Sequence, residues 1–538
     1  MFLICDDLND FVEGMGGHPQ AYTPNISRLA RMGVLFTNAH SNAPMCAPSR
    51  PSFLSGLYPS TTGIYDGKRP FRESPQLKDA VLFPAHFKAN GYRAYSAGKL
   101  FHDPDFTVFG ASEAGSYDGG FLGPRSNYGP YPWDGKLMRY GERPSRDCPD
   151  PFLPQTKLEY EKLGKPWTLG HGRLSRLKEG WSWVYSDHGF LGADGKDGGL
   201  FSYEESGARS LLPDELVADW GVQLLEGEAL RDETGGEIVP INDAPFFLSL
   251  GFVKTHLALY SPDEFYDEVL KANGITEKEV VLPWAQDGKI RFGDWSDIPK
   301  HQDSGSARRR YKGLERAEKE YEGGLEQMLR DYTLSYLAAV YVIDVQVGKV
   351  LDALEKTGRL EETILVFTSD HGYHHGDKES FFKYTLWEKS TRVPLIICDP
   401  SEEFKGTRGK TCDVPVSLID LYPTFVDLCD LPRRAVLEGV SLKPLLANVS
   451  LPVGEERVAL SAVSRGKGKF DEPDAHAFSV RSKSWRYILG PNGEEELYDH
   501  RVDPYELTNL AERPEFHEVK VLLHTELCRL SGRTRLYR

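Results

Sequence analysis

Short apolar runs alternate with amphipathic stretches along most of this chain of 538 residues. Turn-forming residues bound the apolar runs, a pattern that is typical of strands buried on both faces of a parallel sheet. The runs predict strands at Phe2–Cys5, Val34–Phe36, Arg93–Ala97, Phe246–Phe252, Ile364–Ser369 and Leu395–Cys398. The stretches between them are helical in pattern, so we predict an α/β fold in which helices cover a mostly parallel sheet.

Two of the predicted helices have distinct signals. The stretch Thr23–Met32 opens with a capping residue that is followed by a proline in the first turn. The longest stretch, Glu326–Thr357, repeats apolar or aromatic residues at helical spacing, namely Tyr336, Val340, Ile343, Val347 and Leu351. It leads through Gly358 towards the next predicted strand.

Two segments depart from this pattern. Residues 104–210 are rich in Gly, Tyr, Trp, Pro and Asp, which predicts a loop-rich insertion. After Leu446 the pattern changes to short alternating segments at Arg457–Val463, Ala477–Arg481, Trp485–Leu489 and Glu496–Tyr498, with a turn signal at 490–493. We expect a catalytic domain over residues 1–446. A smaller α+β domain over 455–538 would hold an antiparallel sheet and a closing helix at Phe516–Leu530.

Composition narrows the class of protein. With 40% hydrophobic and 12% aromatic residues, the chain is not a disordered protein. Its 64 Lys and Arg against 80 Asp and Glu give a net charge of −16, which argues against nucleic acid as a partner. No apolar run approaches the ~18 residues of a membrane span, so we expect no membrane partner. Seven cysteines without paired spacing exclude a disulfide scaffold and a zinc ribbon.

The first residues carry neither the basic nor the apolar region of a signal peptide. A strand that begins at Phe2 also lacks the usual lead-in. We therefore expect a periplasmic or secreted protein whose leader is absent from this sequence, with a cytoplasmic protein as the alternative.

Acidic residues follow two of the predicted strands. Asp6 and Asp7 follow the first strand, and Asp370 and His371 follow the strand at Ile364–Ser369. Ligands of an open parallel sheet bind at the carboxyl ends of its strands, so these side chains can face one another. Adjacent ionised carboxylates call for a cation, and oxygen donors suit calcium or magnesium, although a histidine nitrogen is a less usual ligand for either. Taken alone, an Asp-Asp pair is more often an ordinary loop feature.

The four letters Ser-Asp-His-Gly occur twice, at 186–189 and at 369–372. The first copy lies inside the loop-rich insertion, where a position at the end of a core strand is harder to argue. We therefore assign the metal-site role to the second copy.

A third cluster is the string Cys46-Ala47-Pro48-Ser49-Arg50. By itself Cys46 is compatible with a small buried hydrophobic residue before a helix. Together with Leu54-Ser55-Gly56, however, the string resembles the signature of the sulfatase family, Cys-x-Pro-Ser-Arg followed by Leu-[Ser/Thr]-Gly. The similarity continues in the family's order at Gly98-Lys99-Leu100-Phe101-His102, Lys254-Thr255-His256, Lys383 and the string at 497–510. It covers nearly the whole chain and is strongest to the iduronate-2-sulfatase branch.

The resemblance implies an alkaline-phosphatase-like fold and a set of cofactors. In this family a maturation enzyme oxidises the cysteine to formylglycine, so Cys46 is expected to become formylglycine. The residues implied to hold a calcium ion are Asp6, Asp7, Cys46, Asp370 and His371.

The same resemblance implies catalytic roles. The hydrated formylglycine at position 46 would attack the sulfur, while Arg50 and Lys99 neutralise that group and the sulfate. His102 would take the proton that lets the sulfated diol collapse. His256 and Lys383 would donate a proton or positive charge to the departing alcohol.

The chemistry of sulfate esters agrees with these roles. Cleavage places charge on the sulfuryl oxygens and on the leaving oxygen, where preorganised cations and a metal supply most of the stabilisation. A diol adduct can collapse to an aldehyde, whereas a thiolate adduct has no easy exit. An acidic chain attracts an anion only through a local positive site. We therefore assign Lys254 to substrate binding, and His374 and His375 are further candidates to line the pocket.

The sequence departs from the iduronate branch near the substrate. Val253 and Thr255 stand where that branch usually has His and Pro, and Leu257-Ala258-Leu259 replaces a proline-containing string. The expected substrate is accordingly a sulfated oligo- or polysaccharide, with a 2-O-sulfated uronate of a glycosaminoglycan or algal polysaccharide as the first candidate. Two alternatives stay open: a phosphate mono- or diester hydrolase of the same superfamily, and a non-catalytic carbohydrate-binding relative. The intact set of catalytic residues argues against the second.

Overall fold

The structure is a computed structural model that describes residues 1–67, 69, 71–102, 127–133, 171–176, 182–187, 200–231, 236–241, 244–285, 297–298, 321, 323–465 and 469–534. Much of the loop-rich insertion predicted at 104–210 lies outside the described residues.

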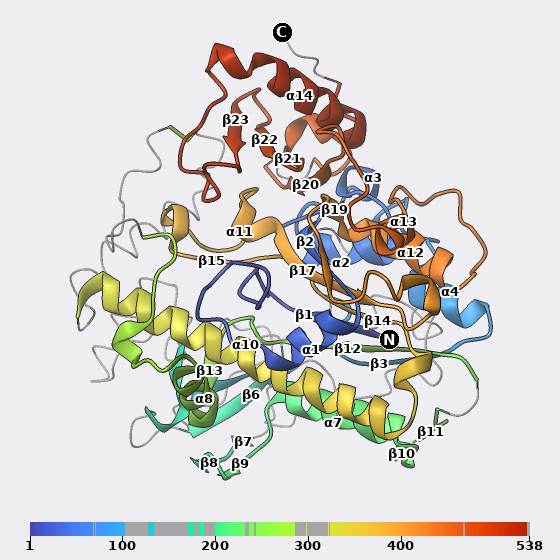
Figure 1. Ribbon diagram of the computed structural model, residues 1–538, viewed down its shortest axis with the longest axis vertical. Helices are drawn as coiled ribbons and strands as arrows, with labels where there is room; N and C mark the ends of the chain where they lie inside the picture. Colours follow the sequence, from blue (N-terminus) through green and yellow to red (C-terminus); the bar gives the residue numbers. More distant parts are fainter. Residues whose placement is uncertain are drawn as a thin grey trace.

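A mixed sheet forms the centre of the molecule (Figure 1). Within the described residues it has eight strands, in the order β18-β2-β17-β14-β1-β12-β3, with β19 also paired to β2. Their bounds are β1 Phe2–Cys5, β2 Val34–His40, β3 Arg93–Gly98, β12 Phe246–Gly251, β14 Leu365–Ser369, β17 Arg392–Cys398, β18 Lys410–Cys412 and β19 Val416–Ser417. Each predicted strand is present, and β2 and β17 are longer than predicted.

The strands of this sheet are parallel except at β17. That strand runs antiparallel to both of its neighbours, β14 and β2, whereas β14, β1, β12 and β3 are parallel to one another. The apolar run at β17 looks the same in either direction, so hydrophobicity could not predict this reversal. The mostly parallel sheet is confirmed.

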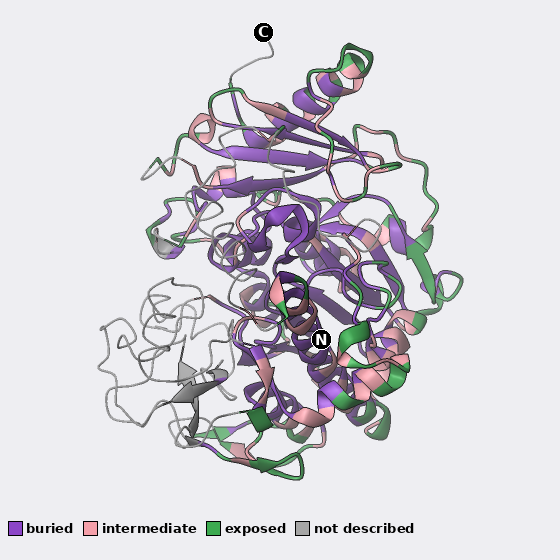
Figure 2. Cartoon of the chain, turned by 90° about the vertical axis from the view of Figure 1, so that its left-hand side faces the viewer, coloured by how far each residue is buried: buried purple, intermediate pink, exposed green. Residues whose placement is uncertain are grey.

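Alternate residues of the strands face two separate cores. On one face, Leu3 and Cys5 of β1 pack with helices α1 (Pro24–Met32), α7 (Pro213–Leu225), α8 (Asp263–Asn273) and α10 (Gly324–Lys356). On the other face, Phe2 and Ile4 pack with α2 (Cys46–Ser55), α4 (Phe83–Ala89), α12 (Leu421–Leu428) and α13 (Lys443–Ala447). Burial on both faces explains why the strands are apolar runs and do not alternate with polar residues. In Figure 2 the strands of the central sheet and the inner helices on either side of it are coloured as buried.

The long helix α10 confirms the predicted stretch at Glu326–Thr357 almost to the residue. All five residues that defined its apolar face are buried. Helix α1 also forms where predicted, but its cap differs. The Thr23 side chain makes no capping hydrogen bond. Instead, Asp344 of α10 accepts hydrogen bonds from the amides of Asn25 and Ile26 at 2.9 and 2.8 Å.

Smaller elements surround the sheet. The remaining short helices are α3 Pro59–Thr62 and α11 Glu388–Thr391. Short strands form small ribbons: β4 Asn127–Trp133, β5 His171–Arg173, β6 Ser182–Asp187, β7 Leu200–Phe201, β8 Tyr203–Glu205, β9 Ala208–Arg209, β10 Leu230–Arg231, β11 Glu237–Ile238, β13 Leu259–Ser261, β15 His374–His375 and β16 Phe381–Phe382.

A second, antiparallel sheet forms the C-terminal part of the chain. Its strands are β20 Ala459–Val463, β21 Ala477–Arg481, β22 Trp485–Leu489 and β23 Glu495–Asp499, and the turn at 490–493 joins the last two as predicted. Helix α14 (His517–Ser531) closes this sheet by packing Leu523 and Leu527 against it.

A buried charge network joins the C-terminal sheet to the central part of the molecule. Arg486 of β22 donates to Glu388 of α11 and to Glu506, at 2.5 Å each. Arg481 also donates to Glu388, at 3.1 Å. Because breaking a buried ion pair leaves an uncompensated charge, this network holds the two parts in one relative position.

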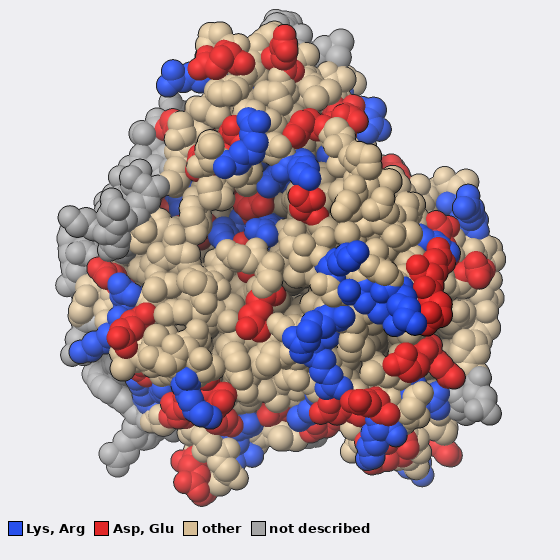
Figure 3. All heavy atoms as spheres, in the orientation of Figure 1, with Lys and Arg blue, Asp and Glu red and all other residues tan. Residues whose placement is uncertain are grey.

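The surface distribution of charged side chains and the character of the helices can be compared with the expectations from composition. Basic and acidic side chains are interspersed over the described part of the face shown in Figure 3, so the net charge of −16 does not form one continuous acidic area there. Among the helices of the described residues, none has the length and apolar character needed to cross a membrane.

Candidate active site

Cys46 stands at the first position of α2, on a helix whose residues are all buried. The helix begins with Met45 as its cap and ends at Gly56, whose φ of 73° is the left-handed conformation that glycine adopts freely. Pro48 lies in the first turn, where a missing amide hydrogen costs no helical hydrogen bond. The cysteine side chain is therefore at the positive end of a helix, where a nucleophile or an anion is favoured.

Two lysines set the charge around the thiol. The Lys383 ammonium lies 3.3 Å from Cys46 Sγ and donates to Asp7 Oδ1 at 2.7 Å. Burial raises the pKa of the Cys46 thiol, but the positive charges of Lys383 and Lys99 outweigh burial and hold the pKa well below its usual value. The position therefore favours a negatively charged or strongly polarised group.

The register of the central sheet brings the acidic residues together. Cys5 of β1 pairs with Ser369 of β14, so the residues that follow these two strands leave the same edge side by side. The Asp7 amide donates to Asp370 Oδ1 at 3.2 Å, and Asp7 has a φ of 66°. Tyr336 of α10 donates its hydroxyl to the Asp7 carbonyl at 2.7 Å.

Arg50 and Lys99 lie against these carboxylates. Arg50 is fully buried and donates to Asp370 Oδ2 at 2.8 Å and to the carbonyl of Leu100 at 3.0 Å. The Lys99 ammonium donates to Asp6 Oδ2. Burial raises the pKa of Asp6, but the surrounding positive groups, Lys99 foremost, together outweigh burial and hold the pKa well below its usual value. Burial raises the pKa of Asp370 to about 6, against the opposing effect of Arg50.

Lys99 reaches this position through a close approach of two strands. Gly98 ends β3 with a φ of 70°, and a Cβ atom there would lie 2.0 Å from the carbonyl oxygen of Gly251. Only glycine therefore allows β3 and β12 to pair to their ends. The partly buried His102 follows shortly after, so the Gly-Lys-x-Phe-His string delivers two candidate catalytic groups from one strand end.

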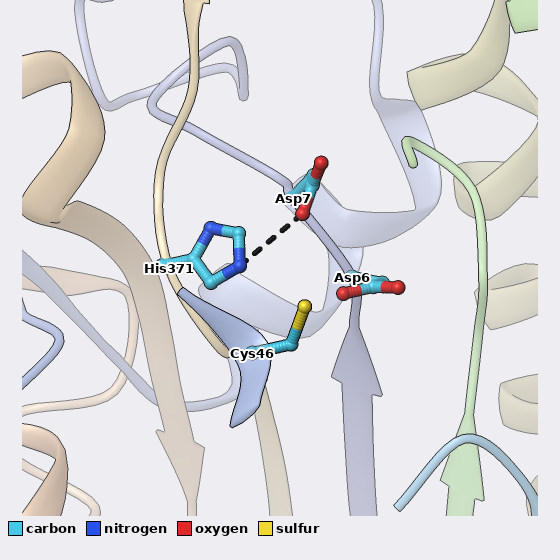
Figure 4. A group of neighbouring side chains, drawn as sticks. All are labelled: Asp6, Asp7, Cys46 and His371. Carbon is cyan, nitrogen blue, oxygen red and sulfur yellow. Dashed lines mark ion pairs between the residues drawn. The ribbon is translucent and has the colours of Figure 1, made fainter. Parts of the chain in front are cut away.

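A group of four side chains forms a candidate cation site (Figure 4). One potential ligand atom each of Asp6, Asp7, Cys46 and His371 lies within 4.8 Å of the others. Asp6 Oδ1 and His371 Nε2 are buried and make no hydrogen bond within the described part of the chain, and His371 Nε2 lies 3.2 Å from Asp7 Oδ1. Burial lowers the pKa of His371, but the Asp370 and Asp7 carboxylates, together with Cys46, outweigh burial and raise the pKa to about 9.

These observations fit a divalent cation. Converging carboxylate oxygens and buried polar atoms without hydrogen bonds are what an ion would satisfy. The surroundings of His371 favour a positive charge on its ring. A cation bound at the same place would supply that positive charge instead. Asp370 lies beside these four residues, and its carboxylate accepts hydrogen bonds from Arg50 and from the Asp7 amide.

His256 approaches the site from the loop after β12. Its ring is partly buried, and Nδ1 lies 2.8 Å from the carbonyl of Leu257. Burial lowers the pKa of His256, and the Asp7 carboxylate opposes this effect. The Thr255 amide donates to the Asp6 carbonyl at 3.0 Å, which ties the loop to the cation site.

The three side chains assigned to substrate binding make other contacts. Lys254 is 3% exposed, and its ammonium donates to two backbone carbonyls. His374 lies between Asp377 and Thr385, at 2.5 and 2.6 Å from its two ring nitrogens. His375 is 1% exposed and stacks on Phe11 at 4.8 Å. All three side chains are thus buried and make contacts within the protein, and their assignment to substrate binding stays a prediction.

The two Ser-Asp-His-Gly strings differ in position as expected. Ser186 and Asp187 belong to β6, which pairs with β4 and β7 outside the central sheet, and His188 lies outside the described residues. Sequence reasoning missed Tyr336 and Asp214, which hold the site by hydrogen bonds to its backbone. Tyr336 looked like one more residue of an apolar helix face, and nothing in the sequence indicates which tyrosine hydroxyl finds a buried partner.

Comparison with known proteins identifies the family. The sequence profile of the sulfatase family matches residues 1–167 and 177–431, and a profile described as N-sulphoglucosamine sulphohydrolase, C-terminal, matches residues 376–533. The chain belongs to the sulfatase family. Sulfatases generally use a formylglycine and a metal ion, in agreement with the cysteine and the candidate cation site found here.

This sulfatase is similar to sulfatases of more than one kind. A sulfatase of Formosa agariphila is 30% identical over 96% of this chain and 83% of that protein. The iduronate 2-sulfatase of Mus musculus is 28% identical over 84% of this chain and 69% of that protein. The resemblance to the iduronate branch is therefore real but no greater than that to other sulfatases.

Solved structures confirm the alkaline-phosphatase-like fold of the sulfatase. The phosphonate monoester hydrolase of Agrobacterium radiobacter has a TM-score of 0.66 and 19% identity, covering 99% of this chain and 95% of that one. A protein solved with its substrate D-glucosamine-2-N,6-O-disulfate has a TM-score of 0.62 and 19% identity, covering 99% and 97%.

Proposed function

We propose that this sulfatase hydrolyses a sulfate ester of an oligo- or polysaccharide, using formylglycine at position 46 and a calcium ion. The observation that carries the proposal is the position of Cys46. It begins a buried helix, lies 3.3 Å from the Lys383 ammonium, and shares a 4.8 Å group of ligand atoms with Asp6, Asp7 and His371. Lys383, Lys99 and Arg50 are paired with the Asp7, Asp6 and Asp370 carboxylates, so a bound ion would give the site the net positive charge that attracts an anionic ester to an acidic protein.

Formylglycine and calcium would supply the nucleophile and the metal charge. Formylglycine, as its hydrate, would supply an oxygen nucleophile for the sulfur in place of the thiol. Asp6, Asp7, Asp370 and His371 would hold the ion, with residue 46 as a further ligand, and the ion would neutralise a sulfuryl oxygen.

The side chains of this protein perform the remaining steps. Arg50 and Lys99 hold the Asp370 and Asp6 carboxylates in place and add positive charge beside the sulfate. His102 would accept the proton of the diol, and His256, with Nδ1 directed to the Leu257 carbonyl, would donate a proton from Nε2 to the leaving oxygen. Lys383 is close enough to both Asp7 and residue 46 to stabilise developing charge on either side.

The substrate class rests on the relatives. The mouse relative is named for iduronate, and the substrate in one similar structure is a sulfated glucosamine. A 2-O-sulfated uronate or related unit of a glycosaminoglycan or algal polysaccharide is the proposed substrate. Such polymers lie outside cells, so we also propose a periplasmic or secreted location, and the proposed partners are this substrate and a formylglycine-generating enzyme.

A phosphate or phosphonate ester is the second candidate substrate, because a phosphonate monoester hydrolase shares the fold at a TM-score of 0.66. Paired assays of 4-nitrophenyl sulfate, 4-nitrophenyl phosphate and a phosphonate monoester of nitrophenol test the reaction with one common leaving group. We expect kcat/KM for the sulfate to exceed the other two by at least ~100-fold, about 2.7 kcal/mol in transition-state stabilisation. A higher kcat/KM for either phosphorus ester would overturn the proposal. A panel of defined sulfated oligosaccharides, with product analysis, then identifies the sugar.

A further inference from the structure

Two charged side chains that the catalytic scheme does not use hold the loop that carries His256. These are Asp214 of α7, which is 1% exposed, and Lys254, which is 3% exposed. Neither contributes to the group of cation ligands. Burying charge is costly unless each group is hydrogen-bonded, so the bonds that these two make indicate what they do.

Asp214 fixes the direction in which the chain leaves β12. Its two carboxylate oxygens accept separate backbone hydrogen bonds, from the amide of Val253 at 2.6 Å and from the amide of Lys254 at 3.0 Å. Asp214 itself lies in the first turn of α7, directly after Pro213. A rigid helix end thus holds the first residues of the loop.

Lys254 closes the other side of the same loop. Its ammonium donates to the carbonyls of Ala258 and Tyr260, at 2.8 Å each. These bonds tie the start of the loop to its return into β13 and enclose the segment with Thr255, His256 and Leu257. Burial lowers the pKa of the Lys254 ammonium to about 8, and the Asp214 carboxylate partly opposes this effect.

The enclosed segment has contacts that depend on this shape. The Thr255 amide donates to the carbonyl of Asp6 at 3.0 Å, and the His256 amide donates to the carbonyl of Val253 at 2.8 Å. The His256 ring also contacts the loop backbone, with Nδ1 2.8 Å from the Leu257 carbonyl. A shift of the loop would move this ring relative to residue 46 without any change at residue 46 itself.

We propose that Asp214 and Lys254 are positioning residues that clamp the loop from both sides and place His256 for proton donation to the leaving group. The proposal rests on the proposed function, because it gives His256 the role of the acid. It also reassigns Lys254, which sequence reasoning placed in contact with substrate.

The test compares two aryl sulfates, so it does not depend on the identity of the sugar. Phenyl sulfate releases a basic phenolate that needs a proton, whereas the charge of 4-nitrophenolate is delocalised and needs none. We expect Lys254→Met to lower kcat for phenyl sulfate by ~10-fold or more and kcat for 4-nitrophenyl sulfate by less than ~3-fold. Asp214→Asn should show the same selectivity. The matched control is Lys271→Met, which removes a lysine whose side chain is 75% exposed on α8 and should leave both rates unchanged.

A double variant separates positioning from loss of stability. In a His256→Ala background the acid is already absent, so adding Lys254→Met should cost less than ~3-fold further on phenyl sulfate. Equal losses on both substrates, or a full additional loss in the double variant, would overturn the proposal. If Lys254→Met does not fold, the isosteric Asp214→Asn decides by the same ratio. A wild-type enzyme inactive on both aryl sulfates would instead contradict the proposed function.

Discussion

Single side chains in this site serve more than one partner. The Lys383 ammonium contacts both Asp7 and Cys46, and Asp370 contacts both Arg50 and the Asp7 amide. Each substitution is therefore expected to disturb the nucleophile and the cation site together, and a measurement of activity alone cannot distinguish the two. A direct readout of the metal is needed.

For single residues, the candidate cation site predicts the effect of a substitution at Asp6. Asp6→Asn keeps the size of the side chain and removes its charge, so the protein should lose its calcium, and kcat/KM should fall by more than ~100-fold. Metal analysis of purified protein measures the calcium content. Thermal melts measure whether added calcium still raises Tm, as it does for a protein whose folded state binds it.

The control for this variant is Asp219→Asn, in which the side chain is 39% exposed and paired with Lys349. It should retain calcium and the response of Tm to calcium. An inactive Asp6→Asn protein with full calcium content and an unchanged response of Tm would remove Asp6 from the metal site.

Sequence alone could predict which residues converge here, because the motifs follow strands whose carboxyl ends share an edge. It could not predict where long side chains point. Lys254 stands two residues before His256, yet its ammonium turns to the carbonyls of Ala258 and Tyr260. His374 follows the metal motif, yet Asp377 and Thr385 occupy both of its nitrogens.

At the scale of elements, the hydrophobic pattern predicts where the strands and helices lie along the chain. It does not predict the direction of a strand in the sheet or the residue that caps a helix. Strands β1, β12 and β14 begin and end within a residue of prediction because both of their faces are buried. The reversal of β17 depends on the path of its connection, which apolar content does not encode. Helix α1 starts where Thr23-Pro24 predicted, but a residue 319 positions away caps it.

The capping of α1 by the buried Asp344 predicts that the free energy of unfolding depends on pH. Burial raises the pKa of Asp344 to about 6, against the hydrogen bonds from Asn25 and Ile26. A carboxyl group with a raised pKa in the folded state contributes stability at low pH, and this contribution is lost as the pH rises from about 4, its unfolded value, to 6. Asp344→Asn does not ionise and escapes the loss.

The free energy of unfolding of wild type and Asp344→Asn, measured in urea from pH 4.5 to 7.5, tests this prediction. The difference should move in favour of the variant by about 2 kcal/mol as the pH rises through 6. The control Asp352→Asn changes a 69% exposed side chain on the same helix and should show no such trend. A difference that is constant with pH, or one that favours wild type at higher pH, would show that Asp344 titrates normally.

At the scale of the whole molecule, the small C-terminal sheet is held against the catalytic part through Glu388, Arg486 and Glu506. The first of these belongs to α11, which follows shortly after Lys383, so the network supports the segment that carries a candidate catalytic residue. The predicted boundaries of the two domains stay a prediction. The family profile of the C-terminal region begins at residue 376, well before the alternating strands that marked the predicted boundary.

The proposed sulfatase activity depends on the chemical form of residue 46. Expression with and without a formylglycine-generating enzyme gives preparations that differ in the fraction of aldehyde at this position. Mass spectrometry of the peptide that contains residue 46 measures this fraction, and turnover of 4-nitrophenyl sulfate measures activity in the same samples. We expect kcat to rise in proportion to the aldehyde fraction and to extrapolate to zero for the thiol. Full activity in a preparation in which Cys46 is entirely unmodified would contradict a formylglycine nucleophile at position 46.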